Sequence, residues 1–227
     1  DGQSYSFVNN ADVSITPTDG VYKFSNLKIH EGSYLNYKYT ANTSDIDQRF
    51  IIPNDSVDTT TLTVKIQESS SDATTNTYTL ASGITGLDST SKVYFLQEVE
   101  GGRFEVYFGD GVLGKAVADG NIVILDYINT NRDAPNGATS FTLSGTVGGF
   151  SNATVTTISN ASGGTGLESI ASIKYNAPRD YSAQDRAVTA EDYKTLVKSL
   201  YANAQAVQVY GGEDAETPDY GKVYISI

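Results

Sequence analysis

The chain has 227 residues, of which 15 are Lys or Arg and 27 are Asp or Glu, and its formal net charge is −12 at pH 7. This acidity argues against binding to nucleic acid or to an anionic membrane surface, and it favours docking onto basic patches of protein partners. The absence of cysteine excludes disulfides, a thiol nucleophile and zinc–thiolate sites. No apolar run approaches the roughly 20 residues that span a bilayer, and the absence of methionine suggests a fragment of a longer protein.

The first two-thirds of the chain has the composition of β-structure. Short runs of Val, Ile, Tyr, Phe and Thr alternate with Ser, Asn, Asp and Gly, which is typical of strands and turns. Residues 20–29 alternate roughly between apolar and polar, which predicts four core positions, Val21, Phe24, Leu27 and Ile29. Residues 32–42 predict a strand rich in tyrosine.

Two further strand patterns follow. In residues 59–68 the alternation places Leu62, Val64 and Ile66 on one face of a strand. Residues 91–100 and 103–111 flank Gly101 and Gly102, a spacing that predicts a hairpin.

Polar segments suggest the boundaries. Residues 69–77 read as a polar loop without core positions. Residues 144–166 are rich in Gly, Ser, Thr and Asn, and they are either a flexible connector or a segment pinned to the body by Val147, Phe150, Val155 and Ile158. We therefore expect a β-rich segment in residues 1–46, a β-rich domain in residues 47–162 and an α+β module in residues 163–227.

After this boundary the apolar period changes to that of helices. Residues 166–178 predict a short helix that stops before Pro178. Residues 189–202 predict the strongest helix, with Thr189 as N-cap and Asp192 closing a capping box. Its apolar stripe consists of Tyr193, Leu196, Val197, Leu200 and Tyr201. Two strands, in residues 206–212 and 222–227, complete a helix–helix–strand–strand module. The predicted fold class is thus α+β, mostly β.

Four Asp-Gly steps, which begin at Asp1, Asp19, Asp110 and Asp119, are the most conspicuous local motif. Asp-Gly between apolar runs favours tight turns, because glycine adopts positive φ without strain. A calcium loop needs several converging oxygen ligands, which residues 108–120 do not offer, and the spacing of a phosphate-binding loop is incomplete there. The steps therefore favour turns over a metal or phosphate site.

Other catalytic signals are weak. The only histidine, His30, lies beside Glu31 at a predicted strand end and is expected at the surface. One His without Cys excludes most catalytic triads and His-rich metal centres. The acidic run in residues 213–219 is expected to be a solvated loop. The 16 tyrosines fit a β core or a protein interface, and less well a carbohydrate-binding surface.

Several short motifs in a fixed order carry a resemblance to a known family. They are FGDG at residues 108–111, ESI at 168–170, NAP at 176–178 and RAVTAEDY at 186–193, followed by a closing strand. Over residues 47–227 the chain resembles the baseplate J-like family of contractile phage tails, and within it the baseplate wedge proteins of T-even-like phages.

The resemblance implies a structural protein of the virion tail baseplate, assembled in the host cytoplasm. It implies self-association as a dimer and in a ring around the tail hub, contacts with other wedge proteins, and a ring that stays connected when the tail contracts. No enzymatic activity, cofactor, metal, nucleic acid, membrane or small-molecule substrate belongs to this picture. Gly109, Asp110, Gly111 and Gly114 would be a family turn signature, kept for the shape of the backbone.

The helix stripe is the part of the sequence for which we expect self-association, through Tyr193, Leu196, Val197 and Leu200. The alternative is that this stripe packs on the two strands that follow it. The alternative for the whole chain is a β-rich adhesin module that depends on calcium or binds carbohydrate.

Overall fold

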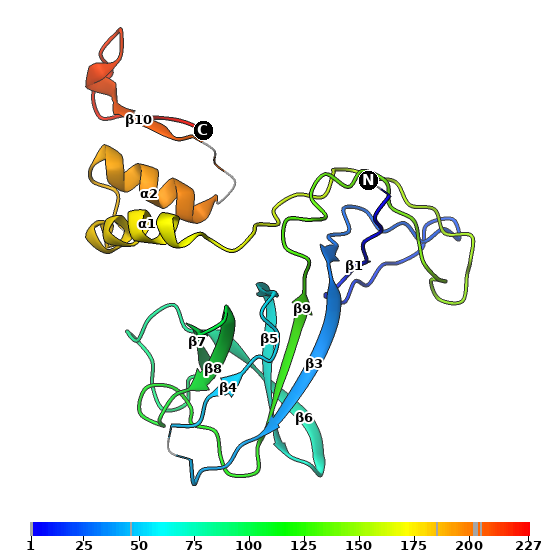
Figure 1. The fold of residues 1–227 in the computed structure, drawn as a ribbon. Helices are drawn as coiled ribbons and strands as arrows, with labels where there is room; N and C mark the ends of the chain where they lie inside the picture. Colours follow the sequence, from blue (N-terminus) through cyan, green and yellow to red (C-terminus); the bar gives the residue numbers. More distant parts are fainter. Residues whose placement is uncertain (1, 46, 185, 202–203, 205) are drawn as a thin grey trace. The chain divides into compact units, whose positions relative to one another are not determined.

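The computed structural model describes residues 2–45, 47–184, 186–201, 204 and 206–227. It divides the chain into two compact units, residues 1–160 (unit 1) and 161–227 (unit 2). Unit 1 holds only strands and unit 2 holds both long helices (Figure 1). The predicted α+β, mostly β fold class is confirmed, and the finer division at residue 46 stays a prediction.

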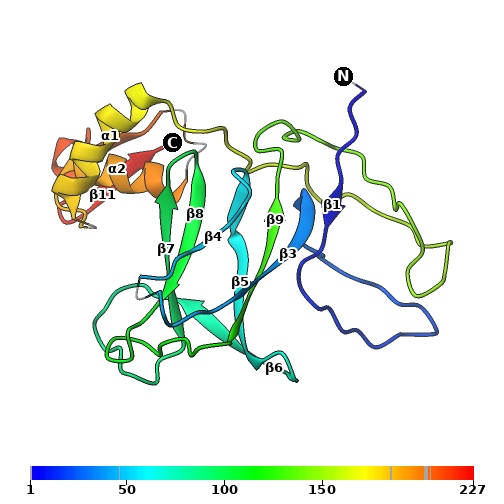
Figure 2. The same cartoon turned by 60° about the horizontal axis from the view of Figure 1, so that its bottom comes forward.

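Unit 1 contains a seven-stranded sheet that curls into a near-closed barrel (Figure 2). Its order is β3-β9-β5-β6-β7-β8-β4. The strands are β3 (Ser33–Thr40), β4 (Phe50–Ile51), β5 (Val57–Ser69), β6 (Asp72–Leu80), β7 (Val93–Val99), β8 (Arg103–Phe108) and β9 (Ile122–Asn129). Neighbours pair antiparallel except β6 and β7, which are parallel.

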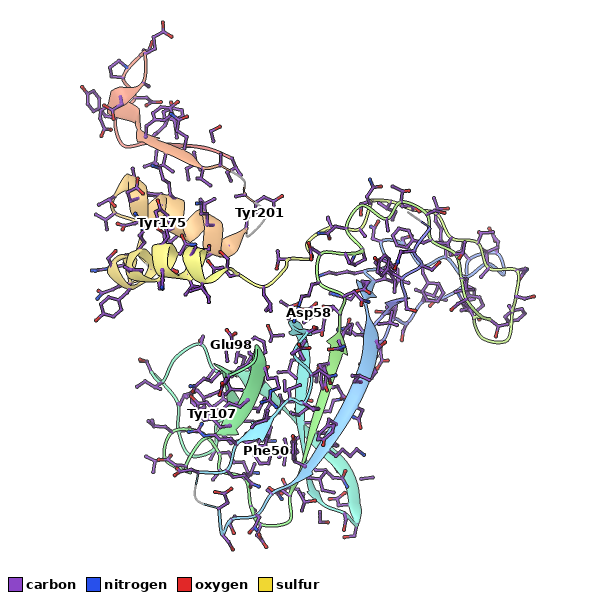
Figure 3. The ribbon with its side chains drawn as sticks, in the orientation of Figure 1. Phe50, Asp58, Glu98, Tyr107, Tyr175 and Tyr201 are labelled. Carbon is purple, nitrogen blue, oxygen red and sulfur yellow. The ribbon has the colours of Figure 1, made fainter. Side chains whose placement is uncertain are left out.

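The barrel interior is filled by apolar residues from every strand. Phe50, labelled in Figure 3, is 1% exposed and lies at the centre of a row of aromatic rings. The predicted inward face of β5 is confirmed, since Leu62, Val64 and Ile66 are buried. β9 is buried on both faces from Val123 to Ile128, as expected of a central strand whose residues are apolar except for Asp126.

The two predicted strand features around β3 and β7 are also confirmed. The tyrosine-rich strand is β3, paired along its whole length with β9. The hairpin across Gly101 and Gly102 joins β7 to β8, and both glycines have positive φ, which the turn requires.

The prediction of a polar loop in residues 69–77 is wrong. Most of this segment belongs to β6, which pairs antiparallel with β5 from Val64–Tyr78 to Ser69–Asp72. Threonine favours strands because of its branched Cβ, and the backbone of this segment finds its partners in β5. Only Ser70 and Ser71 form the turn between the two strands.

The prediction of core positions in residues 20–29 is also wrong. β1 (Phe7–Val8) pairs with β2 (His30–Glu31) over two residues, and the chain between them forms no further strand. Val21, Phe24, Leu27 and Ile29 are all exposed. The one regular feature is a two-residue turn, in which Asp19 and Gly20 both have positive φ and Thr18 and Val21 bond to each other.

Residues 138–160 form the last part of unit 1 and contain no long element. A single bridge joins Val147 to Phe150. Val147, Phe150, Val155 and Ile158 are exposed, so in this structure they do not pin the segment to a core.

Unit 2 is the helix–helix–strand–strand module that the sequence predicts. It consists of α1 (Ile170–Ala183), α2 (Ala190–Leu200), β10 (Gln208–Gly211), the short 3₁₀ helix η1 (Gly212–Asp214) and β11 (Val223–Ser226). β10 and β11 form an antiparallel pair in which Tyr210 stacks on Tyr224 at 5.3 Å. α2 contacts both α1 and β10.

The predicted stop before Pro178 is wrong, because α1 continues through this residue to Ala183. An interior proline costs a helix about 3 kcal/mol relative to alanine. Here α1 packs along α2, and such packing can outweigh the local cost. The predicted start of α2 is confirmed: the Thr189 side chain accepts from the Asp192 N–H at 3.2 Å, and the Asp192 carboxylate accepts from the Thr189 N–H at 2.8 Å.

Candidate functional site

The first candidate feature is the loop that follows β8 and contains the FGDG motif. A Cβ on Gly109 would lie 2.2 Å from the Leu113 carbonyl oxygen, so only glycine fits there without a shift of the loop. Gly111 and Gly114 have φ of +87° and +94°, which favours glycine. The Asp110 carboxylate accepts hydrogen bonds from the N–H groups of Val112 and Leu113, both at 2.9 Å.

This loop does not connect two paired strands, since β8 pairs with β7 and β4 whereas β9 pairs with β3 and β5. It lies instead against the segment between β6 and β7. The Gly114 N–H donates to the Asp88 carbonyl at 3.0 Å, and the Lys115 N–H donates to the Ser91 carbonyl at 2.8 Å. The four motif residues thus shape a backbone loop that docks on the segment around Asp88.

The acids of these two loops are used by their own chain. Hydrogen bonds from Leu113 and Val112 lower the pKa of Asp110 below its ordinary value. Hydrogen bonds from Thr90 and Ser91 lower the pKa of Asp88. Among the residues that the structure describes, no group of three or more His, Asp or Glu side chains is placed to hold a metal ion.

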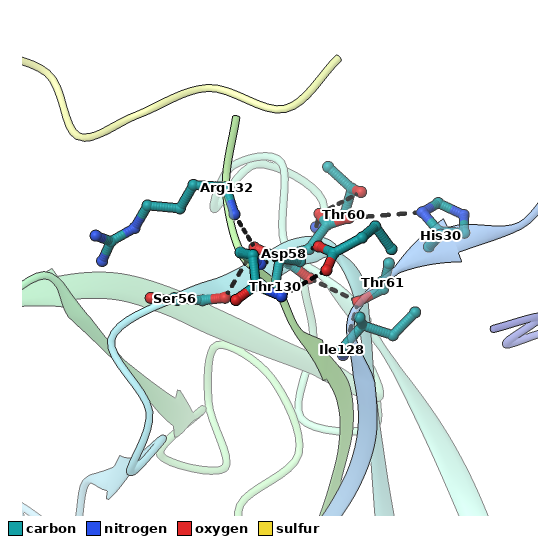
Figure 4. Close-up of polar contacts among 10 residues, drawn as sticks. His30, Ser56, Asp58, Thr60, Thr61, Ile128, Thr130 and Arg132 are labelled. Atoms are coloured by element: carbon teal, nitrogen blue, oxygen red, sulfur yellow. Dashed lines mark hydrogen bonds and ion pairs between the residues drawn. The ribbon is translucent and has the colours of Figure 1, made fainter. Parts of the chain in front are cut away.

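A second feature, which the sequence did not reveal, is the corner where the chain enters and leaves the barrel (Figure 4). Here β5 and β9 lose register between the pairs Asp58–Ile128 and Thr63–Asp126. The Thr61 hydroxyl bridges the break, because it accepts from the Ile128 N–H at 3.0 Å and donates to the Asp58 carbonyl at 2.7 Å. A broken ladder thus keeps its buried polar groups paired.

The same corner holds the N-terminal residues against the barrel. His30 Nδ1 lies 3.6 Å from an Asp58 carboxylate oxygen. The His30 side chain is 19% exposed, so it is more buried than the surface position expected from the sequence. The Glu31 carboxylate accepts from the backbone and side-chain N–H groups of Asn131 at 2.9 and 2.6 Å. The signal in the sequence was the run Asp-Thr-Thr-Thr at residues 58–61, which interrupts the alternation of β5.

The third feature is the apolar stripe of α2. Tyr193, Leu196 and Val197 are half-buried, and none of the residues of α2 is fully buried. Leu200 at the end of the stripe is 86% exposed, and Tyr201, labelled in Figure 3, is also exposed. The stripe therefore contacts its own unit in part and leaves an apolar end uncovered.

The rest of unit 2 is similarly open. The buried apolar side chains that the structure describes here are Ala183 and Val209. Several large apolar side chains are exposed: Leu167, Ile170, Ile173, Tyr175, Tyr181, Leu200, Tyr220 and Ile227. The acidic loop of residues 213–219 is held by its own neighbours, since Lys222 lies 2.7 Å from the Asp219 carboxylate and the Gly212 N–H donates to the Lys222 carbonyl at 2.8 Å.

The geometry and the comparisons with known proteins lead to one class. Two family models, each of which describes a part of a structural protein of phage baseplates, match the barrel and part of the α+β unit. Residues 37–136, the barrel, match the third domain of bacteriophage baseplate wedge protein gp6. Residues 189–227, which contain α2, β10 and β11, match C-terminal domain I of the baseplate structural protein gp6.

A curated relative agrees with both models. The chain is 30% identical to the baseplate wedge protein gp6 of Enterobacteria phage T4, over 58% of this chain and 23% of that protein. The chain therefore spans less than a quarter of the length of the curated relative that it matches. The chain belongs to the gp6 family of baseplate wedge proteins of T4-like phages, structural components of the virion's tail baseplate.

Neither helix of the described part of the chain is long and apolar enough to cross a membrane.

Proposed function

We propose that this chain self-associates within the baseplate wedge, and that it helps to form the ring around the tail hub and to keep that ring connected when the tail contracts. Other wedge proteins are its further partners, and its role is structural rather than catalytic. The net charge of −12 supports partners that present basic patches.

The observation that carries the self-association is the open apolar end of α2. A helix whose stripe is only half-buried, and whose Leu200 is 86% exposed, presents the kind of surface that a helix of another chain covers. α1 and β11 also carry exposed apolar side chains within unit 2. These observations support a contact between copies that includes Leu196 and Leu200.

The experiment is the solution mass of the protein by light scattering over a range of concentrations. We expect the wild type to form a dimer or a larger species, and the variant Leu196→Asp/Leu200→Asp to shift towards the monomer. Ser199→Asp is the control. It also places an aspartate in the same helical turn, but at an exposed position outside the apolar stripe. Circular dichroism checks that all variants are folded.

Two outcomes would contradict the proposal. A folded double variant with the same mass as the wild type would place the self-contact elsewhere. A wild type that stays monomeric at all concentrations would show that these residues do not associate alone.

A further inference from the structure

The barrel of unit 1 is divided into two sub-sheets. The first, which we call the anchored half, contains β3, β9, β5 and β6, and the second, the free half, contains β7, β8 and β4. Within each half most of the backbone ladders are long; the exception is β4, which pairs with β8 only at Phe50–Val106 and Ile51–Glu105. β3 pairs with β9 from Ser33–Asn129 to Thr40–Ile122, and β7 pairs with β8 from Tyr94–Phe108 to Val99–Arg103.

The junction of β6 with β7 is short by comparison. The two strands are parallel, and they pair only at Thr79–Val93 and Leu80–Tyr94. The Thr79 N–H donates to the Lys92 carbonyl at 3.1 Å, and the Ala81 N–H donates to the Tyr94 carbonyl at 2.9 Å. The rest of β6 pairs with β5, and the rest of β7 pairs with β8.

The junction of β3 with β4 has no ladder among the described residues, and these two strands are the edges of the sheet. A side chain joins them, because the Tyr39 hydroxyl donates to the Ile51 carbonyl. The Tyr39 ring also contacts the Phe50 ring, with 5.6 Å between centroids. Both junctions between the halves, which we call seams, thus lack ladders as long as those that join β3 to β9, β9 to β5, β5 to β6 and β7 to β8.

Aromatic contacts in the barrel interior cross both seams. Tyr39 of the anchored half meets Phe50 of the free half, and Tyr78 of the anchored half meets Phe108 of the free half at 5.4 Å. Phe50 and Phe108 meet each other at 5.7 Å. Apolar burial is non-directional, so such contacts tolerate small displacements that would break a row of hydrogen bonds.

The path of the chain decides which half can move. The chain enters the barrel at Ser33 of β3 and leaves it at Asn129 of β9, and these two residues are register partners. Glu31 and Asn131 bond to each other just outside them. Both connections to the rest of the chain therefore belong to the anchored half, and the free half is attached only through the barrel itself.

We propose that the barrel is a two-part joint, in which the free half moves against the anchored half by opening both seams together while the ladders inside each half stay intact. The joint lets unit 1 change shape without unfolding. Sub-global opening of this kind occurs at a lower free energy than global unfolding, so amide hydrogen exchange detects it.

Hydrogen exchange by NMR provides the first test. We expect the seam amides of Thr79 and Ala81 to exchange faster than the ladder amides of Leu125 and Val106, which lie on inner strands of the two halves. Equal rates for all four amides would mean that the barrel opens as one unit, and they would overturn the proposal.

The second test distinguishes a joint from simple fraying at the ends of β6 and β7. Tyr39→Phe removes the hydroxyl bond at the opposite seam. If the seams open together, this change speeds exchange at Thr79 and Ala81 by about two- to tenfold, the effect of one lost hydrogen bond, and leaves Leu125 and Val106 unchanged. Tyr107→Phe, on the outer face of the free half, is the control. Unchanged rates at Thr79 and Ala81 in Tyr39→Phe would show that the seams are independent.

A third test uses engineered disulfides, with which no native thiol can react because the chain has no cysteine of its own. Register partners on adjacent strands have the Cα spacing that a disulfide needs. In the oxidised variant Thr79→Cys/Val93→Cys, the further change Tyr39→Phe should no longer speed exchange of the Ala81 amide. A staple inside the free half, Gln97→Cys/Glu105→Cys, should leave that response in place. The same response in both stapled proteins would contradict the joint.

Discussion

The hydroxyl of Thr61 on β5 accepts a hydrogen bond from the backbone N–H of Ile128 on β9 at 3.0 Å, at the point where these two strands are out of register. The same hydroxyl donates to the carbonyl of Asp58 three residues earlier. Thr61 is 5% exposed and Ile128 is 0% exposed, so water does not replace these bonds. The Thr61 side chain therefore supplies hydrogen bonds where the backbone pairing of β5 with β9 is interrupted.

Thr61→Val should destabilise unit 1 by about 1–3 kcal/mol, because it keeps the shape of the side chain and leaves the buried Ile128 N–H without an acceptor. Thr63→Val, two residues along the same strand, is the control and should change stability by less. The measurement is urea unfolding followed by tyrosine fluorescence. Equal stability of Thr61→Val and the wild type would mean that the backbone closes the break without the hydroxyl.

Gly109→Ala should destabilise the FGDG loop by about 1–3 kcal/mol, the usual cost of forcing atoms into filled space. The added Cβ would lie 2.2 Å from the Leu113 carbonyl oxygen and 2.5 Å from the Gly114 carbonyl carbon. Gly83→Ala is the matched control, since no atom lies within 4 Å of its added Cβ. Thermal unfolding compares the two, and a Gly109→Ala protein as stable as Gly83→Ala would refute the prediction.

Acid should loosen the same loop. Hydrogen bonds from Leu113 and Val112 lower the folded-state pKa of Asp110 below the ordinary value of 3.8. A group with a lowered folded-state pKa stabilises the fold above its unfolded pKa, and this contribution is lost as the pH falls through the folded pKa. The loop should therefore hold at pH 5 and loosen below about pH 4.

An NMR titration of the Asp110 carboxyl carbon checks this directly, and a midpoint at or above 3.8 would contradict it. The amide signals of Val112 and Leu113 should follow the same titration. Asp110→Asn keeps an acceptor oxygen without a titrating group, so in that variant these two amide signals should lose the acid-dependent change.

Lys65→Met should destabilise the barrel by about 1–3 kcal/mol, because it leaves the poorly hydrated Asp126 carboxylate without its positively charged partner. The Asp126 side chain is 7% exposed and accepts from Lys65 Nζ at 2.9 Å and from Asn36 Nδ2 at 2.5 Å. This hydrogen bond to Asp126 is the main reason that the pKa of Lys65 is raised. The double variant Lys65→Met/Asp126→Asn should recover part of the loss.

Chemical unfolding of the four proteins in this double-mutant cycle gives the coupling between the two residues. Lys38→Met is the single-site control and should have a small effect, because Lys38 is an exposed lysine on β3, the strand on the other side of β9. A coupling of zero would mean that water, rather than Lys65, compensates the charge of Asp126.

The sequence predicted those parts of the fold whose cause is local. The alternation of Leu62, Val64 and Ile66 requires only one strand, and the hairpin at Gly101 and Gly102 requires only its turn. The capping box of Thr189 and Asp192 lies within one helical turn. In each case the residues that make the pattern are also the ones that make the contacts.

The errors concern partners distant in the sequence. Residues 72–77 have the composition of a loop, and they become a strand because β5 offers them a ladder. Val21 and Phe24 have the spacing of a core face, but no described strand covers them. Pro178 ends a helix by its local geometry, whereas α1 is supported by its neighbour α2.

The candidate site follows the same rule. The glycines of the FGDG loop can be recognised from their spacing, but their docking on the segment around Asp88 depends on the folded barrel. The corner around Thr61 arises from a slip between β5 and β9, and the interrupted alternation at residues 58–61 does not show which strand lies opposite it. The exposure of Leu200 likewise depends on how far the rest of unit 2 covers α2.

The pairing of Ser33 with Asn129 has a consequence for the history of the chain. A domain whose first and last residues are neighbours can be inserted into, or removed from, a host protein without moving the host's own ends apart. Residues 33–129 form such a cassette. Its replacement by a short turn between Gly32 and Thr130 would leave the polypeptide on either side where it is, so a lineage could exchange this barrel for another without redesigning the flanking segments.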